Sequence, residues 1–233
     1  MTSPTRSSFR SIKDELARRI GERVWQPGSL IPGEETLARE FGAARATVNR
    51  ALQELAQAGL VERKRKAGTR VAANPVRQAR FSIPVVGDEI AALGKSSRYQ
   101  LLSRQVRHAQ KAEATRMGIN PGEKLLHIAC LHYADDVPYQ YEDRLINLAT
   151  VPRAEHEGFE SVGPNEWLVN EAPFSRADFT FLAAAASEKE ARLLNIAPGQ
   201  PVFVGERLTW LLAKPITYVR MVHPPSHRLH TKL

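Results

Sequence analysis

The stretch from Arg45 to Gly59 constrains the fold of this chain most strongly, because it has the pattern of an amphipathic helix with one polar face. Its apolar residues recur at i, i+3, i+4 and i+7, and they are Val48, Ala51, Leu52 and Leu55. The opposite face has no carboxylate at its start and carries Arg45, Ala46, Asn49, Arg50 and Gln53. Arginine can reach guanine or phosphate, asparagine and glutamine can pair with adenine, and Thr47 can bond a phosphate. The pattern fits a helix in the DNA major groove; the alternative is a surface helix with a solvated charged face.

The residues before this helix favour the first interpretation. Residues 33–41 have the pattern of a short helix with apolar side chains on one side. The link 42–44, which contains a glycine, then leads into Arg45. Two helices joined by such a turn are typical of a helix-turn-helix. A supporting helix is indicated over residues 11–24, where apolar residues recur every fourth position.

The residues after the helix predict a wing, which is a β-hairpin with a basic tip. Residues 60–61 and 70–72 read as short strands, and Gly68 suits the turn between them. The tip, residues 63–66, places four cations in succession where a phosphate backbone would pass. The sequence therefore predicts a winged helix that binds DNA.

Residues 8–73 closely resemble the winged-helix domain of the GntR family of bacterial transcription regulators. The matching segments are Pro27-Gly28, Leu30 with Pro32, Glu34, Leu37-Ala38, Phe41-Gly42, Arg45, Thr47-Val48, Arg50-Ala51-Leu52, Leu55, Gly59-Leu60-Val61 and Gly68-Thr69. The resemblance implies a DNA-binding domain over residues 1–75 and a double-stranded DNA operator as partner. The candidate DNA-binding residues are Glu34, Arg45, Thr47, Asn49, Arg50, Arg63, Lys64, Lys66, Gly68 and Thr69.

The chain departs from the family pattern at three positions. Glu35 stands where the family often has an arginine, which replaces one usual contact with an acid. Lys66 stands where the first glycine of the wing is usual, and Arg70 where an aromatic residue is usual. The last two departures add positive charge to the wing.

The distribution of charge agrees with an N-terminal nucleic-acid surface. The chain has a formal net charge of +8, and residues 1–76 hold 14 Lys and Arg against 8 Asp and Glu, a net +6. Residues 77–233 hold 19 against 17, a net +2. An anionic polymer therefore has its complementary surface mainly in the first third of the chain.

Other features of the sequence predict a cytoplasmic protein with no membrane segment. The single cysteine, Cys130, excludes an intrachain disulfide and fits a reducing compartment. The start of the chain, residues 1–8, lacks the apolar segment of a signal peptide. No apolar run approaches the roughly 18–20 residues that a bilayer crossing needs.

The rest of the chain contains a linker and a weak internal repeat. We expect residues 76–95 to connect two domains, with a short helix at 88–93, and residues 96–233 to form the second domain. Each half of the repeat reads as strand, helix and hairpin, and Ile-x-Pro-Gly recurs in both. The expected strands are 98–107, 124–133, 138–146, 174–184, 201–211 and 215–222, and the expected helices are 112–117, 164–172 and one that begins at Ser187. The halves should share one largely antiparallel sheet with helices on one side, which gives an α+β fold.

The second half resembles the UTRA effector-binding domain of the HutC subfamily, which shares its fold with chorismate lyase. Within this subfamily the chain is most similar to the histidine-utilisation repressors. The segments that carry this similarity are Thr47-Val48-Asn49-Arg50-Ala51-Leu52, Cys130-x-His132, Glu142-Asp143-Arg144 and Val219-Arg220. The tail departs from those repressors, because Pro225-Ser226-His227 replaces their usual Gly-Ser-Arg.

Alternation along the strands predicts a pocket with a few polar groups. Leu126, Ile128, Cys130 and His132 share one strand face, Glu142 and Arg144 another, and Ile216, Tyr218, Arg220 and Val222 a third. An arginine, Arg220 or Arg144, would pair a ligand carboxylate, His132 and Glu142 would hydrogen-bond a ring or hydroxyl, and Tyr218 would stack. The candidate effector-binding residues are Arg98, His132, Glu142, Arg144, Tyr218 and Arg220.

Each of these residues also has a simpler interpretation. Glu142 and Arg144 can form a surface ion pair, His132 and Tyr218 can belong to the core, and Cys130 can be a small buried hydrophobic residue. Arg220 is hardest to explain in this way, because an unpaired buried guanidinium is costly.

The sequence also limits the classes of function. It has no recognisable catalytic constellation, so a chorismate-lyase-like enzyme with an appended DNA-binding module is the weaker alternative. A second alternative is an architectural DNA-binding protein that has no ligand. The histidines near the end, at 223, 227 and 230, lack metal-ligand spacing, and we expect no metal and no cofactor.

The expected function is a repressor that a small carboxylate such as urocanate releases from DNA. UTRA domains that bind sugar phosphates tend to carry arginine at the positions of Cys130 and His132, and this chain does not. We expect a homodimer on a pseudo-palindromic site, because one recognition face is too short for genomic specificity. The resemblance implies that the C-terminal sheet supplies the dimer contact.

Overall fold

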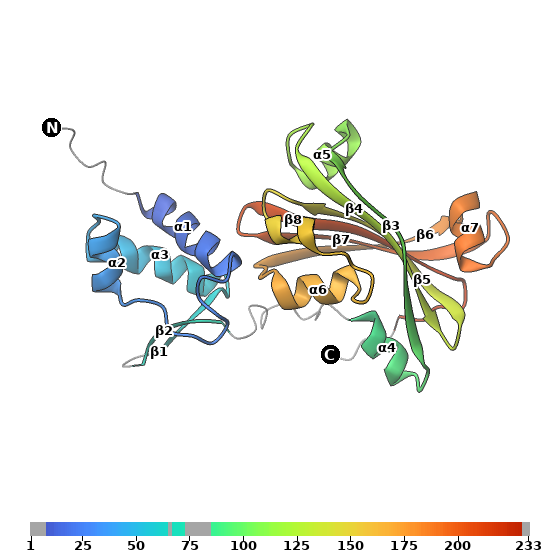
Figure 1. Ribbon diagram of the computed structural model, residues 1–233, viewed down its shortest axis with the longest axis horizontal. Helices are drawn as coiled ribbons and strands as arrows, with labels where there is room; N and C mark the ends of the chain where they lie inside the picture. Colours follow the sequence, from blue (N-terminus) through green and yellow to red (C-terminus); the bar gives the residue numbers. More distant parts are fainter. Residues whose placement is uncertain (1–7, 65–66, 73–84, 230–233) are drawn as a thin grey trace. The chain divides into compact units, whose positions relative to one another are not determined.

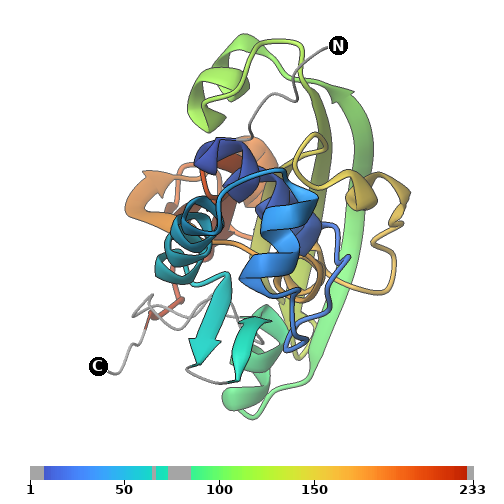
Figure 2. The same ribbon diagram turned by 90° about the vertical axis from the view of Figure 1, so that its left-hand side faces the viewer.

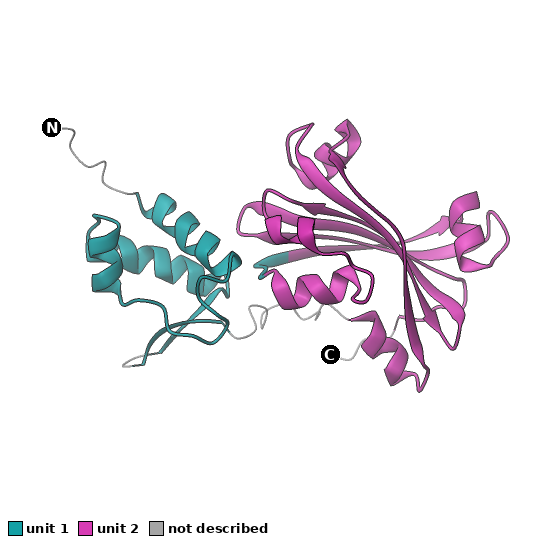
Figure 3. Ribbon diagram, in the orientation of Figure 1, with its two compact units in different colours: residues 1–80, 173–176 teal, residues 81–172, 177–233 magenta. Residues whose placement is uncertain are grey.

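The computed structural model describes residues 8–64, 67–72 and 85–229. The chain divides into two compact units (Figure 3): residues 1–80 with 173–176, and residues 81–172 with 177–233. No helix in the described ranges combines the length and the apolar run that a bilayer crossing requires.

Three helices form the core of the first unit (Figures 1 and 2). They are α1 (Phe9–Gly21), α2 (Glu34–Glu40) and α3 (Arg45–Gln57). The Ser8 side chain caps α1 by accepting a hydrogen bond from the backbone N–H of Ser11 at 3.2 Å. The predicted helix-turn-helix is confirmed, and its apolar stripes are buried at Ile12, Leu16, Ile20, Leu37, Val48, Ala51, Leu52 and Leu55.

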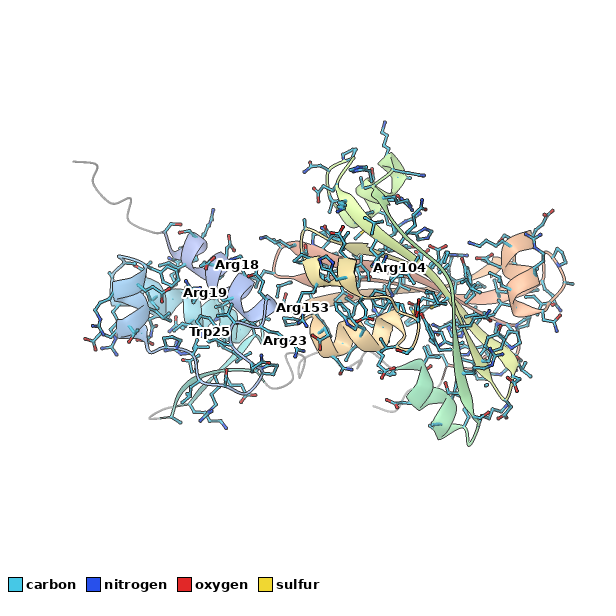
Figure 4. All side chains as sticks on the ribbon, viewed as in Figure 1. Arg18, Arg19, Arg23, Trp25, Arg104 and Arg153 are labelled. Carbon is cyan, nitrogen blue, oxygen red and sulfur yellow. The ribbon has the colours of Figure 1, made fainter. Side chains whose placement is uncertain are left out.

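Arg19 joins α1 to the end of α2 (Figure 4). Its Nε donates to Glu15 Oε1 at 2.8 Å, and its Nη2 lies 2.5 Å from Glu40 Oε1. Its guanidinium lies over the ring of Trp25, 5.6 Å from the centroid, and over the ring of Phe41, 5.2 Å from the centroid. The helix-turn-helix is therefore fixed to the supporting helix by charge and ring contacts as well as by apolar packing.

The wing is a two-stranded antiparallel sheet of β1 (Val61–Lys64) and β2 (Gly68–Val71). Residues 28–31 lie on the other side of β2, where the backbone N–H of Val71 donates to the carbonyl of Ser29 at 2.9 Å. The wing is thus tied to the segment that leads into α2, and the predicted hairpin is confirmed.

The second unit is built on one sheet with the strand order β3-β4-β5-β8-β7-β6 (Figure 1). The first half of the predicted repeat supplies β3, β4 and β5, and the second half supplies β6, β7 and β8. The halves meet where β5 pairs with β8 in antiparallel fashion. The strands are β3 (Ser97–His108), β4 (Lys124–Ala134), β5 (Val137–Asn147), β6 (Arg176–Ala185), β7 (Pro201–Leu211) and β8 (Lys214–His223). The predicted α+β class is confirmed.

The two faces of this sheet differ in chemistry. Cys130 on β4 lies directly across from Glu142 on β5, and Glu142 lies across from Met221 on β8. Because directly paired residues share a face, these residues define one face, here called the polar face. Leu145 and Tyr218, which are also paired, lie on the other face, here called the opposite face.

Helices cover both faces of the sheet, so the expectation of helices on one side was wrong. On the opposite face, α5 (Lys111–Met117) packs with Leu145, and α7 (Glu188–Leu194) packs with Tyr141. On the polar face, α6 (Pro164–Glu171) places Asn165 against two buried arginines. The physical reason is that β4 is buried along most of its length, and consecutive strand residues point to both faces.

Part of the predicted linker belongs to the second unit. Residues 86–92 form α4 (Val86–Ala92), whose Val86 and Ile90 pack with Ala134 of β4 and Tyr139 of β5. Residues 73–84 lie outside the described part of the chain.

Gly68, at the start of β2, adopts a conformation that an alanine cannot take without strain. Its φ is +81°, and a Cβ added there would lie 3.1 Å from Leu30 Cδ2. We predict that Gly68→Ala opens the wing, because left-handed backbone costs an L-residue about 1–2 kcal/mol and the crowding adds to this. Hydrogen exchange of the Val71 and Ile31 amides should accelerate by about tenfold or more. Gly42→Ala is the matched control, since Gly42 has φ +57° and open space around it, and equal wing exchange in both variants would contradict the prediction.

Candidate DNA interface and effector pocket

The carboxylate of Glu34, at the start of α2, contacts three of the predicted DNA-binding side chains. Its Oε2 accepts a hydrogen bond from Arg45 Nε at 3.1 Å. Its Oε1 accepts one from Asn49 Nδ2 at 2.7 Å and one from Arg63 Nη2 at 2.5 Å. Arg45 and Asn49 lie on α3 and Arg63 lies on β1, so one carboxylate joins α2, the candidate recognition helix and the wing.

These contacts favour a positioning role for Glu34. Burial opposes its ionisation, but the hydrogen bonds from Arg45 and Asn49 and the charge of Arg63 hold the pKa of Glu34 below its ordinary value. A carboxylate repels phosphate, whereas the Arg45 side chain remains 73% exposed. Glu34 therefore orients groups that can reach DNA and is itself poorly suited to a phosphate contact.

Of the remaining candidate DNA-binding residues, those that the structure describes lie on α3 or in the wing. Arg50 is exposed on α3, with its guanidinium 4.1 Å from the centroid of the Phe9 ring. Thr47 lies in the first turn of α3, Lys64 ends β1, Gly68 and Thr69 begin β2, and Lys66 lies outside the described residues.

The polar face of the second unit brings together three of the predicted effector-binding residues: His132, Glu142 and Arg144. Their side chains are buried, and Arg144 Nε donates to Glu142 Oε1 at 2.6 Å. The interpretation of Glu142 and Arg144 as a surface pair is wrong, because their side chains are 1% and 0% exposed.

Three further residues that were not predicted from the sequence, Asn165, Thr217 and Arg207, complete this network. Asn165 of α6 accepts hydrogen bonds through Oδ1 from Arg144 Nη2, at 3.4 Å, and from Arg207 Nη2. Arg144 Nη1 also donates to Thr217 Oγ1 at 3.2 Å. Arg207 of β7 is paired with Val219 of β8, which itself lies across from Arg144. Alternation along β7 could have indicated Arg207, because it places this residue on one strand face with Gly205 and Thr209.

The polar face buries more positive than negative charge. Arg144 and Arg207 are both almost completely buried. Among the described residues, the carboxylate within ion-pair distance of Arg144 is that of Glu142, and no carboxylate is that close to Arg207. Burial and the nearby charge of Arg144 lower the pKa of Arg207 to about 9. Burial alone would raise the pKa of Glu142, but the charge and the hydrogen bond of Arg144 hold it below its ordinary value. A second anion would balance the excess charge.

Buried polar atoms without hydrogen-bond partners line the same face. Within the described part of the chain these atoms include Gln140 Nε2, Glu142 Oε2, Arg207 Nε and Thr209 Oγ1. Buried polar groups are normally satisfied in folded proteins. These atoms are therefore suited to a ligand that supplies both donors and acceptors.

A segment held from β3 lies over this face. Arg104, labelled in Figure 4, donates through Nε to the carbonyl of Glu157 at 2.8 Å, next to the 3-10 helix η1 (Pro152–His156). Tyr99 donates through its hydroxyl to the carbonyl of Phe159 at 2.9 Å, and its ring centroid lies 5.4 Å from that of His132. Burial lowers the pKa of His132, so a neutral imidazole faces Tyr99.

The other three predicted effector-binding residues do not lie on the polar face. Tyr218 and Arg220 occupy the opposite face, because the β5–β8 register places Val219 and Met221 next to Arg144 and Glu142 instead. Arg220 is satisfied there by Glu190 at 3.2 Å and Glu206 at 3.4 Å.

Arg98 lies on the edge strand β3, three strands away from Arg220 on β8. It donates to Asp136 at 2.9 Å in the β4–β5 turn, and its guanidinium lies 3.6 Å from the centroid of the Tyr133 ring. The six predicted residues therefore do not form one site.

Comparison with known families assigns both units. The profile of bacterial regulatory proteins of the gntR family matches residues 9–71, and the UTRA domain matches residues 92–228, which is more than half of the chain. The chain belongs to the GntR family and carries a UTRA domain. It is a DNA-binding transcription regulator with an effector-binding domain, and not an enzyme.

Individual relatives place this regulator in the HutC group of repressors. It is 33% identical to the histidine utilization repressor of Pseudomonas putida, over 95% of this chain and 90% of that protein. It is 31% identical to the histidine utilization repressor of Klebsiella aerogenes, over 94% and 90%. The C-terminal domain of the histidine utilization repressor from Pseudomonas syringae pv. tomato superposes with a TM-score of 0.56 at 28% identity, covering 59% of this chain and 98% of that domain.

The Glu34 contacts predict a specific effect on sequence discrimination. Glu34→Gln should release Arg45 and Asn49, and the ratio of specific to non-specific DNA affinity should fall about tenfold, within the ~1–3 kcal/mol of a good base contact. The measurement compares a duplex selected by the regulator from a random pool with a scrambled duplex.

Glu35→Gln is the matched control, because Glu35 is the next residue, is exposed, and changes the net charge equally. It should strengthen binding to both duplexes alike. An unchanged affinity ratio in Glu34→Gln would show that the Glu34 contacts do not orient the recognition side chains.

Proposed function

We propose that this regulator is a homodimeric repressor that is released from its operator by a small carboxylate, with urocanate as the first candidate. It acts in the cytoplasm, where a repressor meets the chromosome. The observation that carries the effector proposal is the buried charge of the polar face, where two guanidinium groups are buried with one carboxylate and that carboxylate pairs with Arg144. A ligand carboxylate at Arg207 supplies the missing negative charge and can be held bidentately.

The remaining groups of the polar face suit a small ring with one donor and one acceptor. Glu142 Oε2 lacks a hydrogen-bond partner among the described residues and can accept from a ring N–H. His132 is a neutral imidazole that can donate or accept, and Tyr99 offers an aromatic face beside it. Urocanate carries a carboxylate and an imidazole on a flat, short chain. The histidine utilization repressors to which the chain is similar point to the same class of ligand.

The absence of arginine at the positions of Cys130 and His132 favours a carboxylate over a sugar phosphate. A phosphate carries more charge and more acceptor oxygens than a carboxylate, and it is best held by several cationic donors. In this chain the two positions carry a thiol and an imidazole, and neither of these replaces a guanidinium as a cationic donor.

The homodimer follows from the size of the DNA-reading surface. The exposed polar face of α3 is short, and one such face reads too few bases to find a site in a genome. In the described part of the chain, β6 is one edge of the sheet and is exposed or half-buried along its whole length. Effector binding then changes DNA affinity only through different affinities for the DNA-competent and DNA-incompetent dimers.

The DNA contacts divide into two classes with different salt behaviour. Lys64→Ala, at the end of β1, should weaken binding to the selected and scrambled duplexes equally and reduce the slope of log affinity against log salt by about one. Arg45→Ala should weaken binding to the selected duplex by about 1–3 kcal/mol more than to the scrambled one. A Lys64 variant with altered sequence preference and an unchanged salt slope would refute this division.

The effector proposal is tested by a pair of arginine variants on the two faces of the sheet. Calorimetry with urocanate should show about 10- to 150-fold weaker binding in Arg207→Met, the range for a lost charged hydrogen bond of ~1.5–3 kcal/mol. Arg220→Met should bind normally, because Arg220 lies on the opposite face with Glu190 and Glu206. The midpoint of unfolding of Arg207→Met should stay the same or rise, since an unbalanced buried charge is removed.

Three outcomes would contradict the proposal. Tight binding of glucosamine 6-phosphate with no response to urocanate would exclude the carboxylate. Equal loss of urocanate binding in Arg220→Met would exclude the polar face as the site. No thermal shift with any small acid would favour a DNA-binding protein without an effector.

A further inference from the structure

Three different metal-ligating side chains meet on the polar face. Cys130 and His132 project from β4, and Glu142 lies directly across from Cys130 on β5. One ligating atom from each lies within 4.8 Å of the other two, and Cys130 Sγ is 3.8 Å from His132 Nε2. All three side chains are buried, with exposed fractions of 0%, 7% and 0%.

The separation of the Cys130 and His132 ligand atoms suits a tetrahedrally coordinated cation, because the two side chains would need to move little to reach it. Zinc–sulfur and zinc–nitrogen bonds of about 2.3 and 2.0 Å place the two ligand atoms about 3.5 Å apart at a tetrahedral angle. The measured separation of 3.8 Å between Cys130 Sγ and His132 Nε2 is close to this value.

The hydrogen bonding of Glu142 gives a second, independent indication of a ligand. Its Oε1 is held by Arg144 Nε at 2.6 Å, which fixes the orientation of the carboxylate. Its Oε2 is buried and has no hydrogen-bond partner in the described part of the chain. A fixed carboxylate with one free, buried oxygen is the arrangement that a metal ligand requires.

We propose that Cys130, His132 and Glu142 bind one divalent cation of the zinc class within the pocket. A thiolate, an imidazole and a carboxylate together select zinc or cobalt over magnesium and calcium, which prefer oxygen ligands. Binding transfers the thiol proton of Cys130 to solvent and forms the metal–sulfur bond without any redox change. Three protein ligands leave the fourth tetrahedral position for water or for a ligand atom.

The cation also has a consequence for the effector, and this part rests on the proposed function. A divalent ion that displaces one proton adds one net positive charge beside Arg144 and Arg207. An anionic effector offsets that charge. With the cation bound, a carboxylate oxygen or an imidazole nitrogen of the effector occupies the fourth position, in place of the hydrogen bonds to Glu142 and His132 that the metal-free pocket offers. Metal and effector should therefore strengthen each other's binding by about tenfold, and by the same factor in both directions.

The test uses the full chain, purified without a polyhistidine tag, stripped with a chelator and titrated with Co²⁺. Cys130 is the single cysteine in the sequence, so a near-ultraviolet thiolate-to-cobalt band reports on this residue alone. We expect one equivalent of Co²⁺, this band, and strong visible bands of a tetrahedral site. Cys130→Ser should lose the near-ultraviolet band, and His132→Gln should weaken binding by more than about tenfold.

His127→Gln is the matched control, because His127 lies on the same strand but on the opposite face, 2.9 Å from Asp143. It should bind Co²⁺ as the unmodified chain does. If Cys130→Ser or His132→Gln does not fold by circular dichroism, slower alkylation of Cys130 in the presence of zinc tests the site in the unmodified chain. Absence of the near-ultraviolet band, or an unchanged titration in folded His132→Gln, would overturn the proposal.

Calorimetry with urocanate, with zinc and with chelator, separates the two proposals. If urocanate binds in the presence of chelator and the cobalt titration shows no near-ultraviolet band, the metal site is refuted and the proposed function stands. A cobalt site with no urocanate heat under either condition would support the metal site and refute the effector. Tighter urocanate binding with zinc than with chelator would support both.

Discussion

The completely buried pair of Glu142 and Arg144 at the centre of the sheet determines how the second unit is assembled. A buried guanidinium has five N–H donors and needs partners for them. Thr217 of β8 and Asn165 of α6 supply partners from two other elements. The β5–β8 register and the helix over the polar face therefore both serve the same arginine, and Asn165 brings Arg207 into the same network.

A single carboxylate has a comparable organising role in the first unit, but at the surface. Glu34 joins α2, α3 and the wing through Arg45, Asn49 and Arg63, while Arg45 stays exposed to solvent. The two glutamates differ in what they leave available. Around Glu34 the paired cations are still partly exposed, so a polyanion can reach them, whereas around Glu142 they are enclosed and suit a small anion.

Local patterns predicted most of the fold, and non-local pairing explains what they missed. The helix-turn-helix, the wing and the repeat all have signals within a few residues of sequence. Alternation correctly placed Tyr218 and Arg220 together, but which face they join depends on the β5–β8 register, which no local pattern contains. Arg220 looked unpaired because its partner Glu190 comes from a helix 30 residues away. Arg207 was missed because its surroundings depend on the pairing of β7 with β8 and on Asn165 of α6, which lies 42 residues away in the sequence.

The internal repeat has a consequence for how such a pocket changes its ligand. Its two halves are offset by 77 residues, as the pairs Ile119 with Ile196 and Tyr141 with Tyr218 show, and the same offset relates Cys130 to Arg207. The thiol and the guanidinium therefore occupy equivalent positions of the two halves, on either side of the antiparallel β5–β8 pair. Equivalent positions in the two halves can carry different side chains independently. One half can keep the group that holds an anion while the other half is altered to suit a new ring, so ligand specificity can evolve without rebuilding the sheet.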